Sequence, residues 1–227
     1  VCSSDLKKKI TNSEELPGAL LQVVDKDGNV VEEWISTDKP HEIVAKLVVD
    51  ESYVLREVRP ADGWAYAEDV PFKVSHDGTV DYVKMEDKPT HVVISKQEIT
   101  GSKELPGCTL QVIDKNGNVV DEWFSTDQPH EIKEKLIADE EYTLREVRPA
   151  DGWAYAEDIP FKVSHDGTVD QVKMEDKPTH VVVSKKKITG KEELPGCHLV
   201  IKDKNGNVVD EWTSSTIPHE IVAKLIA

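Results

Sequence analysis

Apolar and polar residues alternate along most of this chain in short runs. In HVVISKQ (91–97), Val92 and Ile94 fall on one face of an extended strand, while Val93 and Ser95 fall on the other. Further runs of this kind are CTLQVID (108–114), NVVDEWF (118–124), HEIKEKLI (130–137), EYTLREV (141–147), DIPFKVS (158–164) and TVDQVKME (168–175). Asn-Gly and Asp-Gly pairs, which favour hairpin turns, separate several of them. No run has helical length and period, so the pattern predicts an all-β fold.

The strands belong to a repeating unit. The glycine of the tripeptide LPG stands at Gly18, Gly107 and Gly196, a constant spacing of 89 residues. About seven short strands per unit predict tandem small antiparallel β-sandwiches, of the Ig-like or prealbumin-like kind. The expected domains are repeat 1 over residues 7–90, repeat 2 over residues 91–179, and the first half of a third repeat over residues 180–227.

Both ends of the chain depart from the repeat. Residues 1–6 (VCSSDL) do not match the THVVIS that precedes the second unit, and we expect Val1–Leu6 to be an artefactual leader introduced during sequence assembly. Residues 185–227 carry no counterpart of the last strands of a unit. We therefore expect this segment to be disordered or to pair with the strand edge of another chain.

Each complete unit aims three charged residues at its apolar face. Lys96 continues the stripe of Val92 and Ile94, Glu146 follows Tyr142 and Leu144, and Asp176 follows Val172 and Met174. The first unit repeats the arrangement with Lys7, Glu57 and Asp87. Ser3 and Asp5 stand at the apolar-face positions before Lys7, so we expect Lys7 to be less desolvated than Lys96.

These charges allow three interpretations. Charged residues at strand ends are often solvated at the rim of a sheet. A buried cluster of a lysine and carboxylates is a second possibility, close to neutral for stability. The third is chemical: burial lowers the pKa of an amine and raises that of a carboxyl, so a neutral amine faces a protonated acid. A second carboxyl could then move protons while the two groups condense to an amide with loss of water.

Three separated motifs give the chain a family resemblance. ISK…ITG…ELPG, YTLREVRPADGWA and VKMEDKPT, in that order, resemble the Cna B-type domain, an isopeptide-forming, prealbumin-like repeat of Gram-positive surface adhesins and pilins. The resemblance covers both complete units and the opening half of the third. Asp stands where many relatives have Asn, and Arg-Pro-Ala-Asp-Gly-Trp replaces the commoner Ala-Pro-x-Gly-Tyr.

The resemblance implies a bond from Lys7 to Asp87 assisted by Glu57, and one from Lys96 to Asp176 assisted by Glu146. Lys185 is the corresponding lysine of the third unit and has no partner within this chain. The expected function is a structural stalk on the cell wall of a Gram-positive bacterium, monomeric and extracellular. It would not be an enzyme, since the reaction is intramolecular. A host extracellular protein would be bound by regions outside this segment.

Composition narrows the alternatives. A formal charge of −16 disfavours nucleic acid and anionic membranes as partners, because both repel an acidic chain. No apolar run is long enough to insert into a bilayer. The three cysteines form no CxxC pair, and Cys108 and Cys197 occupy a position where the first unit has Ala19, which suggests a small buried site. We therefore expect no cofactor and no metal.

Two rival functions remain open. An external enzyme activity has little support, because His41, His130 and His219 recur in PHEI and others sit in turns. An adhesive module is the main alternative, in which exposed Trp64 and Trp153 of the DGWA loops bind a ligand. The tryptophans after Val-Val in a strand are expected in the core, namely Trp34, Trp123 and Trp212. The turn DKDGN (25–29) is predicted as a hairpin rather than a calcium loop.

Overall fold

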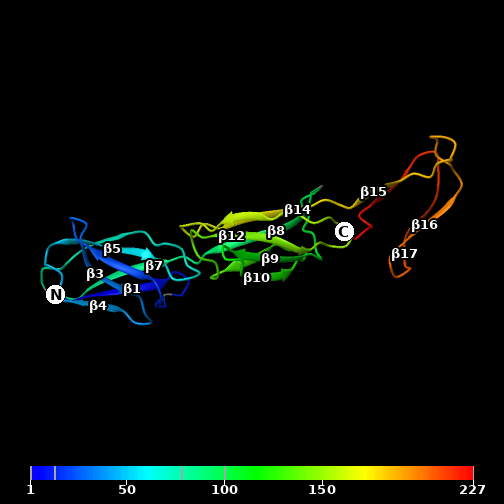
Figure 1. Cartoon of the computed structure of the whole chain (residues 1–227). Helices are drawn as coiled ribbons and strands as arrows, with labels where there is room; N and C mark the ends of the chain where they lie inside the picture. Colours follow the sequence, from blue (N-terminus) through cyan, green and yellow to red (C-terminus); the bar gives the residue numbers. More distant parts are fainter. Residues whose placement is uncertain (1, 13, 78, 100, 227) are drawn as a thin grey trace. The chain divides into compact units, whose positions relative to one another are not determined.

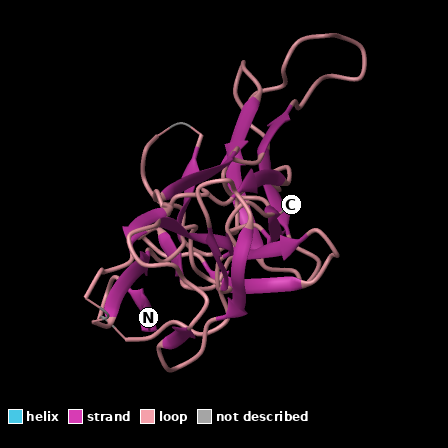
Figure 2. Cartoon of the chain, turned by 90° about the vertical axis from the view of Figure 1, so that its left-hand side faces the viewer, coloured by secondary structure: helices cyan, strands magenta, loops and turns pink. Residues whose placement is uncertain are grey.

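The computed structural model describes residues 2–12, 14–77, 79–99 and 101–226. Strands and loops make up these residues, and none of them is helical (Figure 2). In particular, the described residues contain no helix with the length and apolarity needed to cross a membrane. The all-β prediction is confirmed.

The described residues of the first complete repeat form seven strands in two sheets. Its strands are β1 (Cys2–Lys9), β2 (Leu20–Val24), β3 (Val30–Ile35), β4 (His41–Val44), β5 (Ser52–Arg59), β6 (Val70–Lys73) and β7 (Asp81–Asp87). One sheet has the order β4-β1-β7 and the other the order β3-β2-β5-β6. Figure 1 shows β1 alongside β4 and β7 in this repeat. Residues 2–6, which were expected to belong to an artefactual leader, form the first part of β1. Val1 lies outside the described residues. The fold does not test how these residues arose.

The second complete repeat has the same plan. Its strands are β8 (His91–Glu98), β9 (Thr109–Asp114), β10 (Val119–Phe124), β11 (His130–Lys133), β12 (Glu141–Arg148), β13 (Ile159–Lys162) and β14 (Asp170–Asp176). The sheet orders are β11-β8-β14 and β10-β9-β12-β13. The strand predicted over 130–137 is too long, because Glu134 has a φ of 53° and ends the extended backbone at Lys133.

The first and last strands of repeat 1 pair in parallel. In repeat 1, β1 and β7 run side by side, with Lys7 opposite Met85 and Lys9 opposite Asp87. This parallel pair is an exception within the predicted antiparallel sandwich, whose other described pairs in repeat 1 are antiparallel. A seven-strand chain that returns to its starting sheet can place its two terminal strands in the same direction, and alternation of side chains does not reveal this. Side chains of Lys7 and Asp87, two positions apart in register, share one face.

The main hydrophobic cluster of the first repeat lies between its two sheets. Strand β7 alternates between exposed and buried residues from Tyr82 to Asp87, and β5 does so from Ser52 to Glu57. Both strands thus bury apolar residues and the charged residue that continues the stripe. The buried members of the cluster are Ala19, Leu21, Val23, Ile43, Leu47, Tyr53, Leu55, Val74, Val83 and Met85.

The turn between β2 and β3 is a hairpin, as predicted. Both carboxylate oxygens of Asp25 accept hydrogen bonds from Asn29, at 2.8 Å from its main-chain N and 3.0 Å from its side-chain amide. Gly28 supplies the positive φ of 84° that the turn requires. Because the loop itself uses these oxygens, the hairpin interpretation explains the acidic motif.

The third, half-length unit also forms strands. They are β15 (His180–Val183), β16 (His198–Lys202), β17 (Val208–Thr213) and β18 (His219–Val222). β15 pairs antiparallel with β18, and β16 pairs antiparallel with β17. The predicted disorder of residues 185–227 is therefore wrong for these strands, whereas pairing with another chain stays a prediction.

Candidate cross-linking sites

Lys7 connects the two sheets of the first repeat. Its amine, reaching inward from β1, lies 2.8 Å from Glu57 Oε1 on β5. The same amine contacts Asp87 Oδ1 at the end of β7. Glu57 Oε1 has no well-aligned hydrogen bond among the described residues, so its contact with the amine is an ion pair. One side chain from each of three strands thus meets at a single point inside the sandwich.

The second repeat has the same cluster. Lys96 on β8 lies 2.8 Å from Glu146 Oε1 on β12 and contacts Asp176 Oδ1 at the end of β14. In each repeat, 80 positions separate the lysine from the aspartate along the chain. The site residues predicted from period-2 alternation are brought together in both complete units.

Burial excludes the solvated-rim interpretation. Relative exposures are 3% for Lys7, 7% for Glu57 and 0% for Asp87. In repeat 2 they are 2% for Lys96, 6% for Glu146 and 1% for Asp176. The expectation that Lys7 is less desolvated than Lys96 is therefore wrong. The side chains of Ser3 and Asp5, on which it was based, lie outside the described part of the structure.

The aspartates of the two clusters resist ionisation. Burial raises the pKa of Asp87 to about 7, and the nearby Glu57 adds to the rise while the Lys7 amine opposes it. Burial likewise raises the pKa of Asp176 to about 6, with Glu146 raising it and Lys96 lowering it. Each carboxyl therefore keeps its proton to a higher pH than an ordinary aspartate does, and an acid that must lose its hydroxyl requires this proton.

A chain with Lys7→Met and Lys96→Met should lose stability as the pH rises. This variant keeps the buried carboxyls of Asp87 and Asp176 and removes the two amines that lower the pKa of these carboxyls. A carboxyl with a raised folded-state pKa binds its proton more tightly when folded, so its contribution is present at low pH and is lost as pH rises through that pKa. Between about pH 5 and about pH 8, urea unfolding should show a fall of more than about 2 kcal/mol. An unfolding free energy that stayed level or increased over this window would contradict the assigned burial.

A backbone amide fixes each glutamate. The N–H of Ala67 donates to Glu57 Oε2 at 2.8 Å, and the N–H of Ala156 donates to Glu146 Oε2 at 2.9 Å. Both alanines lie in the AYAED segment that follows the DGW turn. The glutamate therefore keeps one oxygen on the loop and directs the other at the amine. Sequence patterns do not point to these amides, because a main-chain donor leaves no residue-type signal.

Cys108 is a second contact that sequence reasoning missed. Its Sγ lies 3.8 Å from Asp176 Oδ2, and burial raises the pKa of this thiol to about 11. Ligand atoms of Cys108, Glu146 and Asp176 all lie within 4.8 Å of one another, a grouping that could in principle hold a metal ion. However, the Lys96 amine already contacts both carboxylates, so a cation would have to displace it. The residues fit an amine–acid cluster better than a metal centre.

Comparison with known families decides which family this is. The sequence model of the SpaA prealbumin-like fold domain matches residues 3–89 and again residues 90–178. The chain belongs to this family. The prealbumin-like resemblance noted in the sequence is thereby confirmed for both complete units, which are two tandem SpaA prealbumin-like domains.

Several solved structures resemble these SpaA prealbumin-like domains. The Bacillus anthracis TIE protein is 17% identical, with 97% of this chain and 43% of that chain covered and a TM-score of 0.49. The shaft pilin SpaA from Lactobacillus rhamnosus GG is 11% identical, with 79% and 97% covered and a TM-score of 0.37. The C-terminal fragment of the pilus adhesin SpaC from the same organism is 14% identical, with 78% and 97% covered and a TM-score of 0.41. A search of curated protein sequences found no match.

The third unit presents its lysine differently. Lys185 lies two residues beyond the end of β15, outside any strand, and its side chain is exposed. Its main-chain N–H donates to Glu193 at 2.9 Å, as that of Lys96 does to Glu104 in the second SpaA domain. The local backbone is thus like that of a complete unit, whereas the buried environment of the amine is missing here.

The tryptophans differ from the sequence prediction. Trp64 is only 4% exposed and packs with Leu16 and Ala61, while Trp153 is partly buried. The expected exposure of Trp64 is therefore wrong, and the adhesive use of these loops stays a prediction. The strand tryptophans are partly buried and stack on histidines, with ring centroids 4.3 Å apart for Trp34–His41, 4.1 Å for Trp123–His130 and 4.2 Å for Trp212–His219. The PHEI histidines thus have a packing role.

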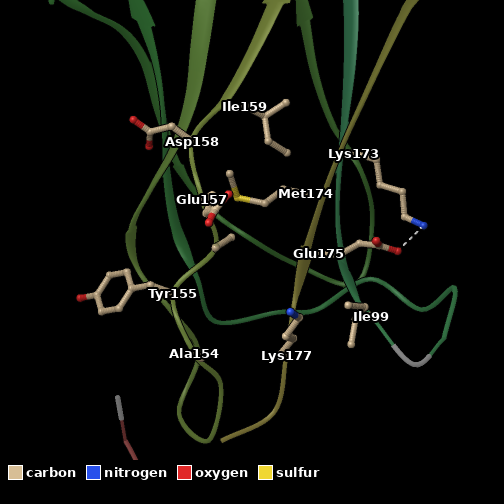
Figure 3. A pocket seen from close by; sticks show the side chains of 11 residues that line it. Ile99, Ala154, Tyr155, Glu157, Asp158, Ile159, Lys173, Met174, Glu175 and Lys177 are labelled. Carbon is tan, nitrogen blue, oxygen red and sulfur yellow. Dashed lines mark ion pairs between the residues drawn. The ribbon is translucent and has the colours of Figure 1, made fainter.

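A groove of about 480 Å³ lies beside the loop that holds Glu146. Figure 3 shows Ile159 and Met174 lining it between the loop and β14, whereas the phenol of Tyr155 points away. Lys173 and Glu175 form an ion pair of 2.6 Å at its side. In this SpaA domain the groove lies against the loop that contains Ala156, whose N–H donates to Glu146.

Proposed function

We propose that each complete repeat locks itself with an amide bond, Lys7 to Asp87 in repeat 1 and Lys96 to Asp176 in repeat 2. The observation that carries the proposal is the buried lysine held between an aspartate and a glutamate from two other strands. A merely structural ion pair needs one carboxylate for one amine. Two carboxyls with one amine leave a proton to share, which is the arrangement that condensation requires.

The reaction balances within the cluster. The neutral Nζ of Lys96 attacks Cγ of Asp176, and a C–N bond forms while a C–O bond breaks. Glu146 accepts a proton from the nitrogen and passes one to the departing oxygen, which leaves as water. Glu57 does the same for Lys7 and Asp87. No cofactor takes part, and the chain acts only on itself, so we do not class it as an enzyme.

Such a bond suits a protein that carries load. It joins the first strand of a repeat to the last. Force applied at the two ends of the repeat then passes through the bond rather than through the sheets. By analogy with disulfides, closing a loop of this length contributes roughly 4–5 kcal/mol. The bond needs no oxidising compartment, which agrees with the absence of paired cysteine spacings.

We further propose a location for this stalk. The resemblance to Cna B-type repeats supports the cell-wall surface of a Gram-positive bacterium, with the repeats acting as monomeric spacers. Membership of the SpaA prealbumin-like family supports the same structural role. A host extracellular protein, in this proposal, binds regions outside these repeats.

The intact mass of the purified chain under denaturing conditions tests the locked state. Each bond removes one water, so the expected mass lies two waters below the sequence mass. Digestion should release branched peptides that contain Lys7 with Asp87 and Lys96 with Asp176. The variant Asp176→Ala, which has no acid to condense, should show a deficit of one water. A wild-type chain at its full sequence mass would refute the proposal.

A further inference from the structure

The two clusters differ at one buried position. Ala19 in repeat 1 and Cys108 in repeat 2 are both fully buried, and each comes just before the second strand of its repeat. Their main chains are held alike, because the N–H of Ala19 donates to Ser36 Oγ at 2.9 Å and that of Cys108 donates to Ser125 Oγ at 2.8 Å. The thiol is therefore the difference between the two sites at this position.

This difference reaches the reacting carboxyl. In repeat 2, Asp176 Oδ2 lies 3.8 Å from Cys108 Sγ, within the range of a sulfur hydrogen bond. In repeat 1, Asp87 Oδ2 is buried and has no hydrogen-bond partner among the described residues. The methyl group of Ala19 cannot donate. One aspartate thus has a donor on its second oxygen and the other does not.

The thiol is suited to donate rather than to react. Burial keeps it protonated at neutral pH, because its pKa is raised to about 11. A protonated thiol is a poor nucleophile and a weak hydrogen-bond donor. Its S–H is therefore available to the neighbouring oxygen throughout the physiological range.

The two oxygens of Asp176 have different surroundings. Oδ1 contacts the Lys96 amine, and Oε1 of Glu146 lies 2.8 Å from the same amine, on this side of the carboxyl. The oxygen on this side is the one that can receive a proton from Glu146 and leave as water. Oδ2, on the side of Cys108, then becomes the carbonyl oxygen of the amide and carries negative charge in the tetrahedral intermediate.

We propose that the Cys108 thiol is a hydrogen-bond donor to the oxyanion formed at Asp176 Oδ2, and that it accelerates bond formation in repeat 2. This inference rests on the proposed amide bond. The S–H proton stays on sulfur throughout, so the overall balance of one amide and one water is unchanged. Repeat 1 carries out the same reaction without this donor.

The expected effect is moderate. Removing a strong backbone or amide donor from an oxyanion site slows reactions about 100- to 1,000-fold. A thiol donates more weakly, so loss of Cys108 should slow the second repeat by about tenfold. The final extent of bond formation should be unaffected, because the donor changes the rate and not the identity of the reacting groups.

The rate is measured on newly made full-length chain. Cell-free synthesis is stopped after a short pulse, samples are denatured at increasing times, and branched peptides of each repeat are quantified by mass spectrometry. Cys108→Ala should slow bond formation in repeat 2 about tenfold and leave repeat 1 unchanged. Cys108→Ser keeps a donor and should be closer to wild type, while Ala19→Cys should accelerate repeat 1.

The outcomes separate the two proposals. If wild type forms branched peptides and Cys108→Ala forms them at the same rate, the thiol has no role and only this inference fails. A Cys108→Ser chain as slow as Cys108→Ala would also overturn it, since packing rather than donation would then be responsible. If wild type never forms a branched peptide, the proposed amide bond itself fails and the inference fails with it. Limited proteolysis identifies a Cys108→Ala chain that has failed to fold, because an unfolded chain loses its resistance to protease.

Discussion

A chain pulled from its two ends should keep both complete repeats closed while its unlocked variants extend. In each repeat, the proposed bond joins a lysine and an aspartate that are 80 positions apart along the chain. We expect this bond to make the segment inextensible, because force would pass from Lys96 directly to Asp176. With Lys96→Met the second repeat should release about 270 Å of chain in one step, since an extended residue spans at most about 3.3–3.6 Å.

Single-molecule force spectroscopy of the chain between marker domains measures this release. Wild type should give no step of that length, Lys96→Met one, and the double variant Lys7→Met with Lys96→Met two. Lys133→Met is a matched control, because Lys133 lies on β11 with an exposed side chain, and it should behave as wild type. A full-length step in wild type would mean that the repeats resist force without a covalent lock.

Alternation of side chains was sufficient to find the three buried charged residues of each complete repeat. A strand has two faces, so a charge in register with apolar neighbours must be either buried or at the rim. Lys96, Glu146 and Asp176 each continue such a stripe, and all three are buried. The same logic applies to the first repeat, where the polar residues before Lys7 gave the wrong expectation. Burial of Lys7 depends on what packs over it from β5 and β7, and the composition of its own strand does not report this.

The pattern of side chains in the sequence did not predict which strands pair with one another. Alternation gives the faces of a strand but not its neighbours, so the parallel partnership of β1 and β7 could not be read from it. Yet this partnership brings the two ends of a repeat together and makes Lys7 and Asp87 neighbours. Family resemblance supplied the pairing of residues that periodicity alone could not.

Loop packing also escaped prediction. The adhesive alternative took Trp64 of the DGWA loop to be exposed, because aromatic residues mark interfaces, but Trp64 packs against Leu16 and Ala61. In each repeat this loop leads to the main-chain amide that holds the glutamate. The amide belongs to Ala67 in repeat 1 and to Ala156 in repeat 2. An aromatic residue in a loop can therefore serve to position the loop rather than to bind a ligand, and only the folded arrangement distinguishes the two.

Replacing Glu146 by Gln should abolish bond formation in repeat 2 and leave repeat 1 intact. The amide side chain preserves the size of Glu146 and can still contact the loop, but it cannot take a proton from the Lys96 amine. General acid–base catalysis contributes about 100- to 10,000-fold, so the reaction should be slowed by at least about a hundredfold. The intact mass should then correspond to loss of one water instead of two.

The first repeat is an internal control for this variant, because Glu57 remains and its branched peptide should form normally. Glu175→Gln is the matched control on the chain, since Glu175 precedes Asp176 on β14 but is exposed to solvent. It should lose two waters, as wild type does. If Glu146→Gln still lost two waters, burial of the amine and the acid would be sufficient by itself. Glu146 would then stabilise the cluster without transferring a proton, and the roles assigned to Glu57 and Glu146 would have to be abandoned together.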